Sequence, residues 1–264
     1  MDGATDPRTA RALRNCPAYT GVFQRRYAQS RTLFTEALHL SRRDLDPAEE
    51  TRALIGLASV EVSVGEGDRA IASVTEGLAA SRAPHNDWIA SIGFVIQGLA
   101  HQLEGRNEEA LASFAEARTH ADRSRRPRML GRVLSFAADI HLRLGRYAEA
   151  KSLLRQAVLL VEEAGDVFLC ARGLTLLGTA ELGEGDPVPA IALHHQALRQ
   201  NQLLSPFTEP GYDWLEMDIR SRLRRAYVVA GCIHEALGQF RAVLEVPGGR
   251  AHRTGPCTGD RGAR

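Results

Sequence analysis

The chain has 264 residues, of which 44% are hydrophobic and 25% are charged, and its formal net charge is +1. This content suffices for a folded core along the whole length, and the near-neutral charge argues against a dedicated nucleic-acid binder, which is usually strongly basic. The sequence has no apolar run of the roughly 18 residues that span a membrane, and its N-terminus lacks the apolar core of a signal peptide. The four cysteines, scattered without metal-ligand spacing, fit a reduced, cytoplasmic protein.

The N-terminal part of the chain predicts helices separated by short breaks. Residues 1–9 are expected to be frayed, and residues 9–25 form at most a poorly patterned helix. A clearer apolar periodicity predicts a helix over 27–42, the second helix of a degenerate first hairpin. Asp46 and Pro47 are typical of a helix start, and the helix that they open runs to about Val64. After a break, Asp68 caps a helix that reaches about Ser81.

The middle of the chain repeats this alternation. Asp87 caps a helix over 88–103, and Asn107 caps its partner after a break at Gly105. Residues 131–164 then carry two apolar stripes at helical spacing. The break between these stripes is Gly145, which can take the left-handed conformation that ends a helix. The stretch therefore predicts a helical hairpin.

The C-terminal part continues the pattern with one interruption. A hairpin opens at Gly165-Asp166, and Pro187 and Pro189 fall in the first turn of its second helix. Residues 205–211 interrupt the array, and helices over 220–230 and 233–246 follow. Residues 247–264 have no periodicity and almost no apolar side chains, so we expect them to be disordered.

The hairpins recur at a fixed interval. The small residue that follows each break recurs every forty residues, at Ser30, Ala70, Ala110, Ala150 and Ala190. The last equivalent, Ala236, comes 46 residues after Ala190, which indicates an insertion of about one turn and a loop. A fixed period of this length is the signature of a solenoid, in which each hairpin buries its apolar face on its neighbours.

The pattern resembles the tetratricopeptide repeat (TPR), W-x2-L-G-x2-Y…A-x3-F. The third unit fills its slots with Phe94, Gln97, Gly98, His101, Ala110, Phe114 and Ala117, and the fourth with Leu134, Ala137, Ala138, His141, Ala150, Leu154 and Ala157. The period of 40 rather than 34 and the missing closing proline depart from it. The long period resembles the sensor arrays of bacterial ATP-dependent (LuxR/STAND-type) transcription regulators. The resemblance implies an all-α, right-handed superhelical solenoid of about six hairpins over residues 10–246.

The resemblance also implies a non-catalytic protein or peptide binder whose concave groove is lined by the first helix of each hairpin. The groove residues expected on these helices are Arg52, Ser59, Arg132, Ser135, Asp139, Arg143, Arg172, Thr175, Thr179 and Arg225. Arg52, Arg132 and Arg172 occupy the same slot in three repeats, and stacking would align them as a ladder that suits carboxylates. We therefore expect an acidic protein segment as partner, in bacterial regulation, without metal or cofactor.

Several alternatives compete with this interpretation. The chain could be the ligand-sensing fragment of a larger regulator, although it has no phosphate-binding G-x-x-x-x-G-K-[ST] motif of its own. An enzyme would have to use His141, Asp139 and His194, but His194 occupies the slot of Phe114 and Leu154, which favours a packed histidine. The basic run from Arg123 to Arg132 could bind nucleic acid, but a solvated loop between repeats is the favoured interpretation.

Overall fold

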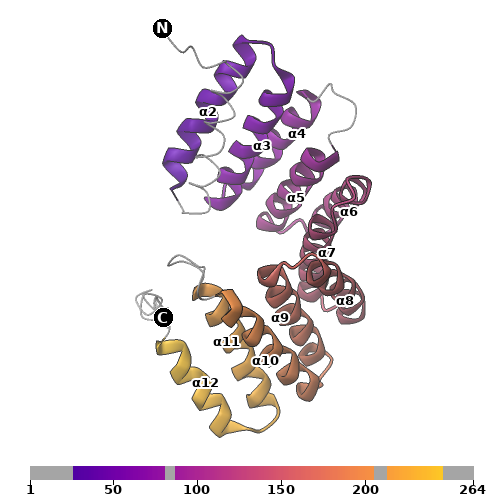
Figure 1. The fold of residues 1–264 in the computed structure, drawn as a ribbon, viewed down its shortest axis with the longest axis vertical. Helices are drawn as coiled ribbons and strands as arrows, with labels where there is room; N and C mark the ends of the chain where they lie inside the picture. Colours follow the sequence, from indigo (N-terminus) through magenta and orange to yellow (C-terminus); the bar gives the residue numbers. More distant parts are fainter. Residues whose placement is uncertain (1–25, 81–86, 205–212, 246–264) are drawn as a thin grey trace, which may run out of the picture. The chain divides into compact units, whose positions relative to one another are not determined.

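The computed structural model describes residues 26–80, 87–204 and 213–245, and these ranges contain eleven helices and no strand (Figure 1). The helices are α2 (Tyr27–Arg43), α3 (Pro47–Ser63), α4 (Gly67–Ala80), α5 (Asp87–Leu103), α6 (Asn107–Arg123), α7 (Pro127–Arg143), α8 (Tyr147–Glu163), α9 (Val167–Gly183), α10 (Pro187–Leu204), α11 (Asp213–Val229) and α12 (Ile233–Glu245). The predicted frayed end, the helix over 9–25, the interruption at 205–211 and the tail 247–264 lie outside the described residues. No described helix is long and apolar enough to cross a membrane.

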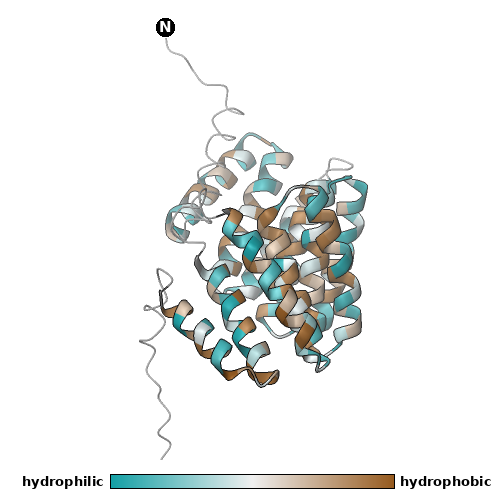
Figure 2. Ribbon diagram, turned by 60° about the horizontal axis from the view of Figure 1, so that its bottom comes forward, coloured by the Kyte–Doolittle hydropathy of each residue, from teal (hydrophilic) through white to brown (hydrophobic). Residues whose placement is uncertain are grey.

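The chain divides into two compact units, residues 1–144 and 145–264. In the first, α3 packs against α4 and α5 against α6, while α2 packs on α3 and α6 on α7. In the second, α9 packs against α10 and α11 against α12, while α8 packs on α9 and α10 on α11. Each unit is therefore a stack of antiparallel helices. Polar and apolar residues interleave along the helices because each helix buries one face (Figure 2).

Local sequence explains where the helices begin. The Asp46 carboxylate accepts a hydrogen bond from the Glu49 N–H at 3.2 Å, and Asp166 accepts one from the Leu169 N–H at 2.9 Å. Pro47 and Pro187 occupy the first helical position, where the missing N–H costs least. The turn inside each hairpin has a glycine with positive φ at the helix end, including the predicted Gly145.

Three predicted caps are wrong by one or two residues. The structure places Asp68, Asp87 and Asn107 inside their helices rather than before them. The Arg106 and Glu66 carbonyls already accept intrahelical bonds from the N–H groups of Ala110 and Ala70. The backbone turn therefore begins the helix before these polar side chains are reached, and the acidic ones instead face the positive end of the helix dipole.

The repeat register is confirmed by burial. Ser30, Ala70, Ala110, Ala150 and Ala190 are all fully buried, and Ala236 is nearly so. A second slot pairs a small residue of the first helix with a larger one of the second. Within the described units these pairs are Ala58 with Val74, Gly98 with Phe114, and Gly178 with His194. A Cβ atom at Gly98 would lie 2.6 Å from Phe114 Cε1, so only glycine allows this approach.

The turn between hairpins supplies a first prediction. Leu45, Arg125 and Gly165 occupy the same slot with φ of 54°, 51° and 67°, a region that favours glycine. Arg125 is exposed, so its side chain contributes little packing. We expect Arg125→Gly to raise the free energy of unfolding by about 0.5–1 kcal/mol in urea titrations. The reverse change, Gly165→Ala, should lower it by about 1 kcal/mol, and equal midpoints for both variants would contradict this account.

Candidate functional site

Within each unit the first helices of successive hairpins lie side by side, and the predicted site residues belong to these helices. In the first unit α3 contacts α5, and Gln102 of α5 reaches Asp139 of α7; in the second unit α9 contacts α11. We call the predicted residues, together with two further polar ones, the first-helix face; they belong to both units, and the part in each unit is described by itself. Its members are Arg52, Ser59, Arg132, Ser135, Asp139, Arg143, Arg172, Thr175, Thr179 and Arg225, with Gln102 and Arg222 added by the structure.

In the first unit the face centres on Asp139. Its Oδ2 accepts hydrogen bonds from Gln102 Nε2 at 3.0 Å and from Arg143 Nε at 3.2 Å. Arg143 is exposed, whereas Arg132, about three turns earlier in α7, is half-buried. Asp139 therefore ties α5 to α7 and restrains the Arg143 guanidinium, so that its remaining N–H donors keep a defined direction.

Arg52 and Ser59 occupy the same face of α3. Arg52 forms an ion pair with Glu49, one turn earlier in the same helix. Ser59 donates a hydrogen bond to the Ile55 carbonyl oxygen at 3.1 Å. Arg52 therefore pairs with an acidic residue of its own helix.

In the second unit Arg222 of α11 organises the face. Its Nε donates to both carboxylate oxygens of Asp218, at 2.9 and 3.0 Å, and its Nη1 donates to Thr179 Oγ1 of α9 at 2.8 Å. Arg172 lies half-buried on α9, and Arg225 is exposed on α11. Thr179 occupies the same repeat position as Asp139. In both units the residue at this position accepts a hydrogen bond from a side chain of a neighbouring first helix, Gln102 for Asp139 and Arg222 for Thr179.

The predicted exposure of Ser135 and Thr175 is wrong, since the structure leaves them only 2% and 1% exposed. Each hydroxyl donates to the carbonyl oxygen four residues earlier, Ser135 to Gly131 at 2.9 Å and Thr175 to Ala171 at 2.7 Å. Because this local bond satisfies the donor, a small hydroxyl side chain can be buried without the cost of an unpaired polar group. Whether either residue contributes to binding stays a prediction.

The arginine ladder stays a prediction as well. Arg52 and Arg132 belong to the first unit and Arg172 to the second, and Ile92 fills the slot on α5. In the second unit the same slot on α11 is Asp218, which lies 46 residues after Arg172 because of the insertion. The face is therefore a mixed surface with an excess of arginine rather than a single row.

The three residues of the enzyme alternative lie in two different units. His194 is fully buried, and neither of its ring nitrogens has a hydrogen-bond partner within the described residues. Burial first, and then the charges of Arg222 and His195, lower the His194 pKa to about 4. His194 is thus a packed side chain, as its slot predicts. His141 and Asp139 belong to the other unit, and the described residues contain no group of three or more His, Cys, Asp or Glu that could hold a metal ion.

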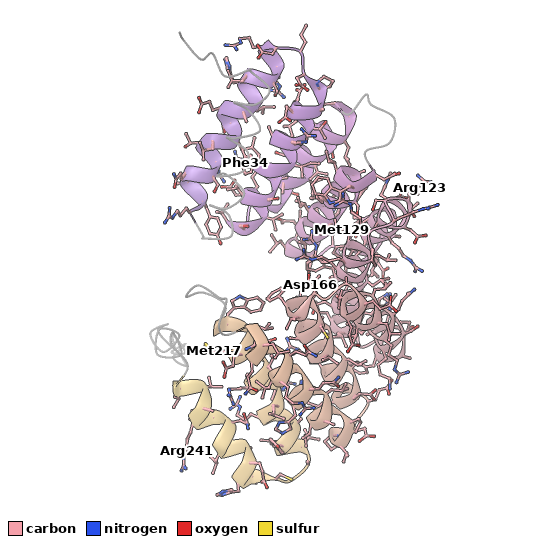
Figure 3. All side chains as sticks on the ribbon, viewed as in Figure 1. Phe34, Arg123, Met129, Asp166, Met217 and Arg241 are labelled. Carbon is pink, nitrogen blue, oxygen red and sulfur yellow. The ribbon has the colours of Figure 1, made fainter. Side chains whose placement is uncertain are left out.

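The basic run between α6 and α7 lies at the surface. Arg123, Arg125 and Arg126 are exposed, and the Arg126 guanidinium lies 5.2 Å from the centroid of the Trp88 ring (Figure 3 labels Arg123). This cation–π contact holds one arginine of the run against the protein itself. The arrangement agrees with the solvated loop between repeats that the sequence favours.

Two units of stacked antiparallel helices, repeated at a forty-residue interval, define an all-α protein built of helical hairpins. Residues 129–202 match the family model described as tetratricopeptide repeat. This match covers residues 129–202, and the solved structures below are similar in fold over a longer part of the chain. No curated protein is significantly similar to it in sequence.

Three solved structures illustrate the similarity of fold. BtubC (BKLC) from P. vanneervenii is 16% identical with a TM-score of 0.68, over 97% of each chain. A putative kinesin light chain with nearly identical TPR-like repeats, from Podosopora anserina, is 16% identical with a TM-score of 0.60, over 79% of this chain and 98% of that one. A Rap protein complexed with competence and sporulation factor is 13% identical with a TM-score of 0.67, over 92% of this chain and 65% of that one. At these identities the likeness establishes the fold alone.

Proposed function

We propose that the chain is a non-catalytic scaffold that binds an acidic protein or peptide segment along the first-helix face, in bacterial regulation. The carrying observation is the restraint of Arg222, whose guanidinium is held by Asp218 and Thr179 across two neighbouring helices. An arginine fixed in this way loses little conformational freedom when a carboxylate docks against its remaining N–H donors.

The charges of the face support an acidic partner. It carries the arginines 52, 132, 143, 172, 222 and 225, whereas its carboxylates are Asp139, Asp218 and the Glu49 that pairs with Arg52. Among the residues named for the face, arginines therefore outnumber carboxylates. Opposite charge across an interface speeds association and selects the partner. Among the proteins of similar fold, the Rap protein holds a bound factor, which supports a regulatory scaffold.

The experiment is a pull-down from bacterial extract with the wild-type chain and with Arg132→Glu/Arg172→Glu. We expect the double variant to lose the captured partner, because two of the six arginines of the face reverse their charge, while helical circular dichroism is unchanged. Arg118→Glu/Arg123→Glu is the matched control, since it makes the same change of charge on exposed residues of α6. Undiminished capture by the first double variant would show that the partner binds elsewhere.

A further inference from the structure

The last helix carries a largely exposed apolar stripe. Ile233, Leu237 and Phe240 are 57%, 52% and 42% exposed, and Leu244 continues their spacing along one side of α12. Val229, at the end of α11 beside the turn, is exposed too. Single exposed apolar residues are ordinary on protein surfaces, but a contiguous stripe along a helix marks an interaction surface.

The repeat register shows what kind of element fits this stripe. Phe240 occupies the slot of Phe34, Phe114 and His194, which are all buried. In each of these cases the first helix of the next hairpin lies close. Phe34 of α2, labelled in Figure 3, lies against Gly56 of α3 by its ring distances, and the Phe114 ring stacks on Phe136 of α7 with centroids 5.9 Å apart. By this register, the element that fits against α12 is an amphipathic helix.

The residues that follow α12 cannot supply that helix. Residues 247–264 contain no Leu, Ile, Val, Phe, Met or Trp, and they include five glycines and two prolines. Such a composition offers no apolar face to lay on Leu237 and Phe240. This composition therefore disfavours the tail as the occupant of the stripe.

Two arginines, Arg224 and Arg241, lie beside the apolar stripe and favour an occupant with negative charge. The Arg224 guanidinium lies 5.9 Å from the Phe240 ring centroid on the α11 side. Arg241 is exposed beside Leu237 and Phe240 on the other side, whereas Glu235 lies nearly opposite the stripe by the 3.6-residue period. Two copies of α12 in a symmetric antiparallel contact would bring the Arg241 flank of each against that of the other, which like charge disfavours.

We propose that the α12 stripe is a docking site for an amphipathic helix of another protein whose apolar face is flanked by carboxylates. Leu237 and Phe240 would be covered as Phe34 and Phe114 are, and Arg224 and Arg241 would pair with the flanking carboxylates. This surface is distinct from the first-helix face, because it lies on the second helix of the last hairpin.

The chain itself supplies two matched probes. A synthetic peptide with the sequence of α3 has three glutamates and one arginine, a net charge of −2, whereas one with the sequence of α7 has three arginines and one aspartate, +2. Both sequences form first helices that pack on the second helix of a preceding hairpin. With helix-stapled, fluorescent versions, anisotropy titrations of the full chain should show binding of the acidic peptide at least tenfold tighter than of the basic one.

Variants locate the binding. Leu237→Glu should weaken binding of the acidic peptide by about tenfold or more, since it puts a charge in the centre of the stripe. Leu159→Glu, at an equally exposed leucine of α8, should leave it unchanged, and Arg241→Glu should shift preference toward the basic peptide. Arg132→Glu/Arg172→Glu should also leave it unchanged, which separates this proposal from the first-helix face.

Three peptide-binding results would overturn the proposal. They are no binding of either peptide, equal binding of both peptides, and loss of binding in Arg132→Glu/Arg172→Glu but not in Leu237→Glu. A fourth such result is a dimer of the wild-type chain in sedimentation that Leu237→Glu dissociates, because a second copy would then cover the stripe.

Discussion

Gly98→Ala should destabilise the protein although alanine is the better helix former. The new Cβ would lie 2.6 Å from Phe114 Cε1 and 2.8 Å from two further ring atoms. Phe114 is buried and stacked on Phe136, so its ring cannot swing away without disturbing the contact between α6 and α7. Overpacking of this kind costs about 1–3 kcal/mol and exceeds the gain of about 0.5–1 kcal/mol in helix propensity. We expect a net loss of about 1–2 kcal/mol in urea unfolding.

Gly238 provides the matched control for this change. It lies inside α12 with no atom within 4 Å of a Cβ built on it, so Gly238→Ala should raise stability by about 0.5–1 kcal/mol. The two variants gain the same helix propensity, so opposite changes in their free energy of unfolding would show the effect of the close approach of α5 and α6 alone. If both variants gain stability, the packing of Phe114 against Gly98 is not what the structure shows.

A second substitution, at Phe114, tests whether the size of this side chain is what requires glycine at position 98. The second repeat pairs alanine with a smaller residue than phenylalanine, Ala58 with Val74. Phe114→Leu alone should cost about 1 kcal/mol, but Gly98→Ala should cost nothing further in its presence. We therefore expect a coupling energy of about 1 kcal/mol or more in the double-mutant cycle, and additive losses would contradict this explanation.

The hairpins were predictable because their signals are local. A cap such as Asp46, a glycine at the hairpin turn and a small residue every forty positions all act within a few residues of their partners. The same regularity predicted that His194 would be a packed side chain, since it shares the slot of Phe114. Asp68, Asp87 and Asn107 lie inside their helices rather than at the predicted caps, and for Asp68 and Asn107 a preceding backbone carbonyl already accepts an intrahelical bond.

The first-helix face was less predictable. Periodicity identifies which side of a helix a residue occupies, but not whether a neighbouring helix covers it. Ser135 and Thr175 are buried because an intrahelical hydrogen bond satisfies each hydroxyl. Arg222 was missed because it occupies a slot that is Phe136 and Leu176 in the preceding repeats, and the six-residue insertion hides that equivalence. An arginine in an otherwise apolar slot is the signal that could have found it.

His194→Phe should remove much of the acid sensitivity of the second unit. The folded-state pKa of His194 is lowered to about 4, from about 6.5 for an ordinary histidine, because burial and the charges of Arg222 and His195 disfavour the imidazolium. The unfolded chain therefore binds a proton more readily than the folded one. The stability contributed by neutral His194 is complete above pH 6.5 and is lost as the pH falls toward 4.

Between pH 7 and 4.5 the protonation of His194 should lower the free energy of unfolding by about 2–3 kcal/mol. Phenylalanine should fit the slot, since Phe114 fills the equivalent one over Gly98 as His194 does over Gly178. We expect the variant to keep most of that free energy at pH 4.5, measured by urea unfolding at both pH values. His39→Gln, at an exposed histidine of α2, should leave the pH dependence of the wild type unchanged. If His194→Phe loses as much stability in acid as the wild type, other groups cause the loss, and His194 is solvated in solution.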